Sequence, residues 1–298
     1  MVRCICNAVR RIGRARVAPP SIAPNGKPRR FPVIQRNTVS PFAPYADFLP
    51  CVPAQLQILE NPHMFSPKSP FLNFPSNLDR RQAFYLDGIR HAAEIIDLSF
   101  SRLSDNLTDL VRDVSESKRS NGYAFFYLDA WAFVDAVDRF IALWKLQPNA
   151  DLIPYQWSPR KLADELMVIR KIRNVSDHIA QRADEIISSN TAAFGELSWV
   201  TVLSESPLEI KSCLIRPGFL PHSLDVQINV PEQRFIIKNH SGNILLKAHT
   251  YTANLSNTYS TIMEIIEYAE SSLKGAFKSQ DASKSIGGDL IATCNLQV

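Results

Sequence analysis

The sequence predicts an α+β protein: an antiparallel helical bundle followed by a small antiparallel β-sheet and a C-terminal helix. Residues 77–190 carry apolar side chains at the three- and four-residue spacing of amphipathic helices. From Leu197 the pattern changes to short segments rich in β-branched and aromatic residues, separated by turns with proline or glycine. Helical spacing returns at about Ala253 and continues to Phe277. A hydrophobic content of 45% is enough for a substantial core.

Residues 1–76 are expected to be mostly extended or disordered. They hold thirteen of the twenty prolines and show neither helical nor alternating periodicity. The apolar run from Phe42 to Ile58 is costly to leave in water, so it could still pack as a strap across the folded body.

The positive charge of the chain is concentrated at its N-terminus. Residues 1–46 contain nine Lys or Arg and no Asp or Glu, so removing them from the total of +4 leaves −5 for the remainder. This basic arm has three interpretations: a contact with nucleic acid or a membrane surface, an organelle presequence, or a leader without a role. No stretch of eighteen apolar residues occurs, so we expect a soluble, cytoplasmic protein without a membrane-spanning helix.

Two strong helices begin the bundle, which we expect to occupy residues 77–195. The first is expected from a cap at Asn77 to about Ser117, and the turn Ser120-Asn121-Gly122 then reverses the chain. The second, from Tyr123 to Gln147, is apolar on more than one face and should lie centrally. The acids within it need partners if they are buried: Asp129, Asp135 and Asp138.

A third helix is predicted from Pro159, after the cap Ser158, to about Ser189. Residues 196–278 then form a sheet and a helix that either closes the bundle or packs on the sheet, and residues 279–298 form a mobile tail. The expected strands are Trp199–Leu203, Ile210–Arg216, Leu224–Val230, Arg234–Lys238 and Ile244–Ala248.

The third helix carries the only functional signal above background. Arg170, Asn174 and His178 follow one another at four-residue steps on one face, and Arg173 and Asp177 form a second such pair. Two cations, an amide and an imidazole therefore share less than three turns.

Arg173, Asn174 and His178 also match a motif of an arginine, a polar residue, three variable residues and a histidine. By this motif the chain resembles the HEPN superfamily. The bundle-like helical pattern that accompanies the motif covers roughly residues 77 to 190. The resemblance implies a helical bundle, often dimeric. The function that we expect from it is a metal-independent endoribonuclease of a toxin or defence system, and the alternative is a non-catalytic member. The resemblance also implies RNA as substrate, a homodimer, and an antitoxin-like or other protein partner.

The chemistry of metal-independent RNA cleavage fits these residues. The imidazole of His178 suits an acid or base, and the planar fork of Arg173 suits a phosphate. Asn174 would orient the imidazole or a phosphate oxygen, and Arg170 would add substrate-binding charge. Arg173 and His178 lie about 140° apart around a helix, so they share a groove only if a second helix or subunit covers them.

The same residues have a structural interpretation. Asp135 or Asp138 would pair with Arg139 or Arg173 and hold the helices together, and Asp177 would tie up Arg173. The chain would then be a non-catalytic HEPN-like binding or oligomerisation module, and a nucleotide-binding accessory domain is a weaker third alternative. We expect no cofactor and no metal site. The cysteines and histidines do not have the spacing of metal ligands, and Asp135 and Asp138 without further ligands would make only a weak metal site.

Overall fold

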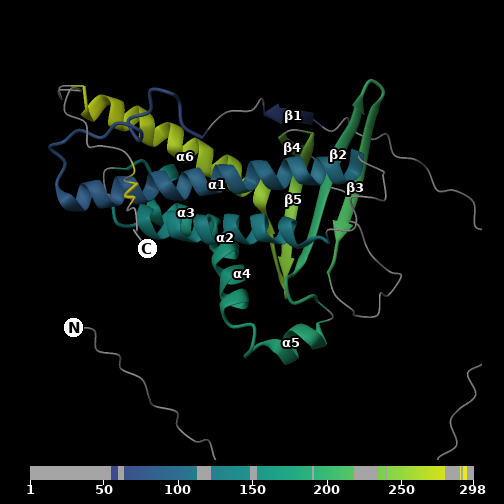
Figure 1. Ribbon diagram of the computed structural model, residues 1–298. Coiled ribbons are helices and arrows are strands. Elements are labelled where there is room, and N and C mark those ends of the chain that lie inside the picture. The colour runs from purple at the N-terminus through teal and green to yellow at the C-terminus, as the bar shows by residue number, and fades with distance from the viewer. Residues whose placement is uncertain are drawn as a thin grey trace, which may run out of the picture. The chain divides into compact units, whose positions relative to one another are not determined.

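The computed structural model describes residues 55–59, 64–112, 122–147, 153–189, 191–217, 234–238, 240–278, 289 and 291–293. These residues form a mixed sheet with helices packed against one of its faces (Figure 1), which confirms the α+β class. The helices are α1 (Arg80–Arg112), α2 (Ala124–Trp144), η3 (Tyr155–Trp157), α3 (Pro159–Glu165), α4 (Met167–Asp177), α5 (Ala183–Ser188) and α6 (Leu255–Ala276). None of the described helices is long and apolar enough to cross a membrane.

Helix α1 begins at a reciprocal capping box. The Asp79 carboxylate accepts the backbone N–H groups of Arg81 (2.8 Å) and Gln82 (2.9 Å), and the Gln82 side chain accepts the N–H of Asp79 (3.3 Å). The expected cap at Asn77 is therefore wrong by two residues. The expected end near Ser117 lies outside the described residues.

Helices α1 and α2 form the antiparallel hairpin that the turn at Gly122 predicts. The turn glycine has φ +68°, a left-handed conformation that glycine adopts without strain. Side chains from both helices fill the core between them, among them Ile89, Ile96, Leu103, Phe133, Val137 and Phe140.

The predicted third helix is not continuous, which corrects the expectation of one helix from Pro159 to Ser189. It breaks at Leu166 and again over residues 178–182, giving α3, α4 and α5. Short helices depend on packing of an apolar face, and every residue from Ser176 to Gln181 is exposed. His178 is consequently the C-terminal capping residue of α4 and not a mid-helix position.

The sheet contains β1 (Gln55–Leu59), β2 (Glu196–Glu205), β3 (Leu208–Ile215), β4 (Arg234–Lys238), β5 (Ser241–Ala248) and β6 (Tyr251–Asn254). Its order is β1-β4-β5-β2-β3, and β6 pairs with β5 beyond the end of β4. Just before β2, Gly195 has φ +85°, and a Cβ there would lie 2.5 Å from the carbonyl oxygen of Lys247 on β5. Glycine at this position therefore permits the close approach of two chain segments.

One pairing corrects the expectation of a purely antiparallel sheet, because β1 runs parallel to β4. No tight turn connects these two strands, so local turn geometry does not impose an antiparallel direction. The expected strand Leu224–Val230 lies outside the described residues.

The segment after β1 also belongs to the folded body. Met64, Phe65, Phe71 and Phe74 are buried in the main core, and Ser66 donates both its N–H and its hydroxyl to Glu270 of α6 (3.3 Å each). The expected boundary at residue 76 is therefore too late, because aromatic side chains drive burial here although proline prevents a helix.

Helix α6 both closes the helical bundle and packs on the sheet, the two alternatives that the sequence left open. Its Tyr259 stacks on Phe100 of α1 with ring centroids 4.4 Å apart, which closes the helical layer. Its Ser256 hydroxyl accepts the backbone N–H of Ile244 on β5 (2.9 Å), which joins it to the sheet. Bundle and sheet therefore share one core rather than forming two units.

Candidate functional site

Arg173 of the candidate motif lies against α2 and is held by two carboxylates. Its Nη1 donates to Asp138 Oδ2 at 2.7 Å, and its Nε donates to Asp135 Oδ1 at 3.1 Å. The Asp138 side chain is 11% exposed, whereas the side chains of Arg173 and Asp135 are 35% and 39% exposed. The arginine therefore joins α4 to the most apolar helix of the chain.

Further charged groups surround this pair and balance it. Arg139 Nη2 lies 2.7 Å from the second oxygen of Asp135, and Asp177 Oδ2 lies 4.0 Å from Arg173 Nε. Arg170 is held only loosely, with Nε 3.9 Å from Asp138 and a side chain that is 62% exposed. Three aspartates and three arginines thus face one another across α2 and α4.

Arg173 stays protonated in this environment. Burial alone would lower the pKa of its guanidinium, but the charges of Asp138, Asp177 and Asp135 outweigh burial and raise the pKa above its ordinary value. Arg173 thus acts as a fixed cation between carboxylates.

The other two motif residues lie on the solvent side. Asn174 and His178 are both exposed, and the His178 Nδ1 pairs with Gln181 Oε1 at 3.0 Å. Within the described part of the chain no hydrogen bond joins the His178 ring to Arg173 or to the Asn174 side chain. The structure therefore brings Arg173 together with Asp135, Asp138 and Asp177, but it does not join His178 to them.

Asp138 makes the shorter contact with Arg173, and the sequence had indicated Asp135 or Asp138 as partners of Arg139 or Arg173. The sequence did contain a signal for it, because an acid inside a strongly apolar helix must find a partner. The spacing of three residues between Asp135 and Asp138 then lets one guanidinium reach both carboxylates.

A second buried acid on α2, Asp129, is less well compensated. Its Oδ1 lies 3.2 Å from Arg102 Nη2, whereas its buried Oδ2 has no hydrogen-bond partner among the described residues. Burial raises the pKa of Asp129, and the charge of Arg102 only partly opposes this.

We expect Asp129→Asn to gain stability relative to the wild type as the pH rises. The raised pKa means that the folded state holds this proton more tightly than the unfolded state, so ionisation costs stability as pH climbs above the ordinary value of 3.8. The measurement is the difference in urea midpoint between variant and wild type from acid to neutral pH. Exposed Asp184→Asn is the control, and a difference that does not change with pH would contradict the expectation.

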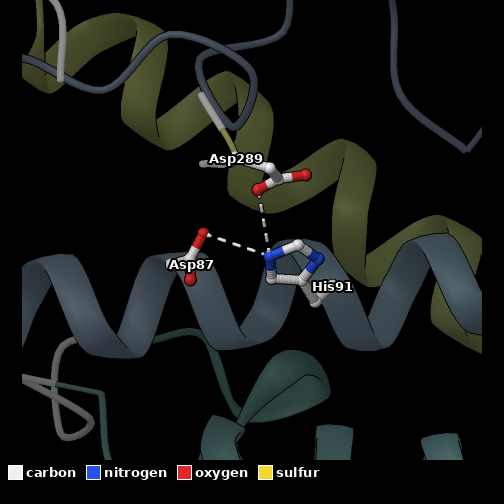
Figure 2. Close-up of side chains that lie close together, drawn as sticks. All are labelled: Asp87, His91 and Asp289. Carbon is white, nitrogen blue, oxygen red and sulfur yellow. Dashed lines mark ion pairs between the residues drawn. The ribbon is translucent and has the colours of Figure 1, made fainter. Parts of the chain in front are cut away.

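Asp87, His91 and Asp289 form a cluster whose ligand-type atoms lie within 4.8 Å of one another (Figure 2). His91 Nε2 is 3.6 Å from Asp87 and 3.5 Å from Asp289. The Nη2 of Arg90 already lies at the centre, 3.0 Å from Asp87, 2.7 Å from Asp289 and 2.9 Å from His91 Nε2. Because the Arg90 guanidinium already pairs with both carboxylates, the arrangement suits an ion-pair network that holds Asp289 against α1 better than a metal site.

Comparisons of the chain with protein-family models, with curated proteins and with solved structures gave no match.

Proposed function

We propose that this chain is a non-catalytic HEPN-like module that self-associates, with the motif residue Arg173 serving as a structural ion pair. The observation that carries the proposal is the engagement of Arg173 by Asp138 and Asp135. A phosphate that approached this guanidinium would have to compete with two carboxylates already bound to it and would be repelled by them.

The position of His178 supports the same conclusion. Acid-base catalysis needs the imidazole within hydrogen-bond reach of the group whose proton it transfers, next to the charge that stabilises the phosphate. His178 instead lies at the exposed end of α4 and pairs with Gln181. The Arg173 ion pair lies one turn back along the helix, against α2.

The surface that we assign to self-association is the α4–α5 arm, defined as residues 167–195. In Figure 1, α5 lies apart from the α1–α2 hairpin. Large apolar side chains of this arm are exposed: Ile187 by 65%, Phe194 by 62% and Met167 by 51%. The same arm carries Arg170 and Lys171 on α4 and Asp184 and Glu185 on α5, so a second copy offers both apolar and opposite-charge contacts.

The test is the molar mass of the purified full chain, measured by light scattering during size-exclusion chromatography. We expect a dimer with twice the 33.5 kDa mass of the chain and a shift to monomer in Ile187→Asp, because an aspartate there would be buried without a partner in the dimer.

The matched control is Leu128→Asp on α2, where the side chain is 63% exposed but lies outside the arm. This variant should remain dimeric. A monomeric wild type at high concentration, or a dimer that Ile187→Asp leaves intact, would refute self-association through the arm.

Metal-independent endoribonuclease activity is the second candidate. What favours it is the exposure of Asn174 and His178 beside the loosely held Arg170, which leaves an imidazole, an amide and a cation open to solvent. RNA cleavage in EDTA that requires both Arg173 and His178 and leaves 2′,3′-cyclic phosphate ends would establish this candidate.

A further inference from the structure

A hollow is lined by residues from the N-terminal part of α1, the C-terminal end of α2 and the C-terminal half of α6. Its volume of about 340 Å³ falls in the range of small-molecule pockets. Aromatic side chains form much of its wall, including Tyr85, Trp144, Tyr268 and Phe277. Asp, Glu, Lys, Arg and His are all absent from the described residues that line it.

One polar group in this apolar wall lacks a partner. The Gln147 amide oxygen accepts a hydrogen bond from the Tyr85 hydroxyl at 3.2 Å, but its Nε2 is buried without a hydrogen-bond partner among the described residues. Exchanging the two amide atoms would leave the oxygen unpartnered instead, so either orientation offers one unmet hydrogen bond. Leaving such a group buried and unpaired is costly, which makes it a natural anchor for a ligand.

The walls of the pocket are held in place by contacts of their own. The Trp144 Nε1 donates to the backbone carbonyl of Trp157 at 2.8 Å, and Trp157 stacks on Tyr268 with centroids 5.9 Å apart. Burial raises the pKa of Tyr85, so its hydroxyl stays protonated and remains a donor. A pre-formed apolar wall of this kind loses little conformational freedom when a ligand enters.

We propose that this pocket binds an uncharged, mainly apolar small molecule of one or two rings, which uses a single hydroxyl or carbonyl group to bind the Gln147 amide. The absence of charged lining residues argues against a phosphate-bearing or carboxylate ligand, since neither charge would be compensated. The inference is independent of the proposed self-association, because the pocket lies outside the α4–α5 arm.

Two probes of matched shape test the proposal on the full chain: diphenylmethanol, which has one hydroxyl, and diphenylmethane, which has none. We expect both probes to bind saturably. Diphenylmethanol should bind about tenfold more tightly, because one hydrogen bond to a buried polar group raises affinity by about that factor. In Gln147→Leu the two affinities should become equal. Isothermal titration calorimetry or ligand-observed NMR measures them.

A second pair of variants locates the binding. Ala276 lines the pocket and is exposed, so Ala276→Trp should fill the mouth and weaken both probes at least tenfold without disturbing the core. Ser271→Trp, on the same helix but outside the lining, should bind as the wild type does. The proposal is overturned if neither probe binds saturably, if Gln147→Leu keeps the difference between them, or if both tryptophan variants behave alike.

Discussion

Replacing Tyr259 by alanine is expected to lower the free energy of unfolding by about 4 kcal/mol, as truncation of a fully buried aromatic side chain does. The ring is 0% exposed and stacks on Phe100 at 4.4 Å. Its hydroxyl donates to Asp97 Oδ1 at 2.6 Å, and the other oxygen of Asp97 accepts the N–H of Met64 at 3.4 Å. Tyr259 and Asp97 together thus link α6, α1 and the segment before α1.

The measurement is urea unfolding, followed by both circular dichroism and tryptophan fluorescence. Tyr259→Phe keeps the ring and isolates the hydrogen bond to a carboxylate, for which we expect a loss of about 2 kcal/mol. Tyr155→Ala is the control, because that side chain is 74% exposed and should change stability by less than about 0.5 kcal/mol. If Tyr259→Ala unfolded in two separate transitions, bundle and sheet would be distinct units, contrary to the single core.

The sequence predicted α1, α2 and α6 well because their apolar spacing is strong and each packs along its length. It failed at the third helix, where the spacing of Ile172, Ile179 and Ile186 looks helical but Ile179 is 36% exposed. Periodicity shows which residues are able to face a core, not whether a core extends far enough to meet them. The pairing of β1 with β4 was equally out of reach, since the two strands are separated by most of the chain.

The candidate site was predictable as a set of residues but not as an arrangement. Acids within the apolar helix α2 need partners, and Arg139 and Arg173 were the partners expected from the sequence. Which aspartates of α2 Arg173 contacts depends on the rotation of α4 about its axis relative to α2. The sequence does not specify that rotation. The environment of the Gln147 amide could not be predicted either, because Tyr85, which donates to its oxygen, lies 62 residues away in the sequence.

Replacing Arg173 by leucine is expected to lower the free energy of unfolding by about 2 kcal/mol. Removing one partner of a buried ion pair costs more than this, but here Arg173 and Asp135 keep about a third of their side-chain surface in solvent, which weakens the effect. The cost arises chiefly at Asp138, which is 8% exposed as a residue and would lose its 2.7 Å contact.

Arg170→Leu is the matched control for this prediction. It removes the same charge from the same helix one turn earlier, but its only ion-pair contact among the described residues is 3.9 Å long and its side chain is 62% exposed. We expect a change of less than about 0.5 kcal/mol. Similar losses in both variants would mean that general charge balance, and not the Arg173 contacts, stabilises the junction of α2 and α4.

The same variants separate the two functional candidates when they are also assayed on a mixed RNA pool in EDTA. For a structural arginine we expect no cleavage by the wild type and a stability loss in Arg173→Leu alone, with His178→Ala as stable as the wild type. For a nuclease, cleavage would be present and would disappear in both Arg173→Leu and His178→Ala. Since exposed His178 contributes little to packing, loss of cleavage in His178→Ala could not be attributed to unfolding and would make the ribonuclease the better description of this chain.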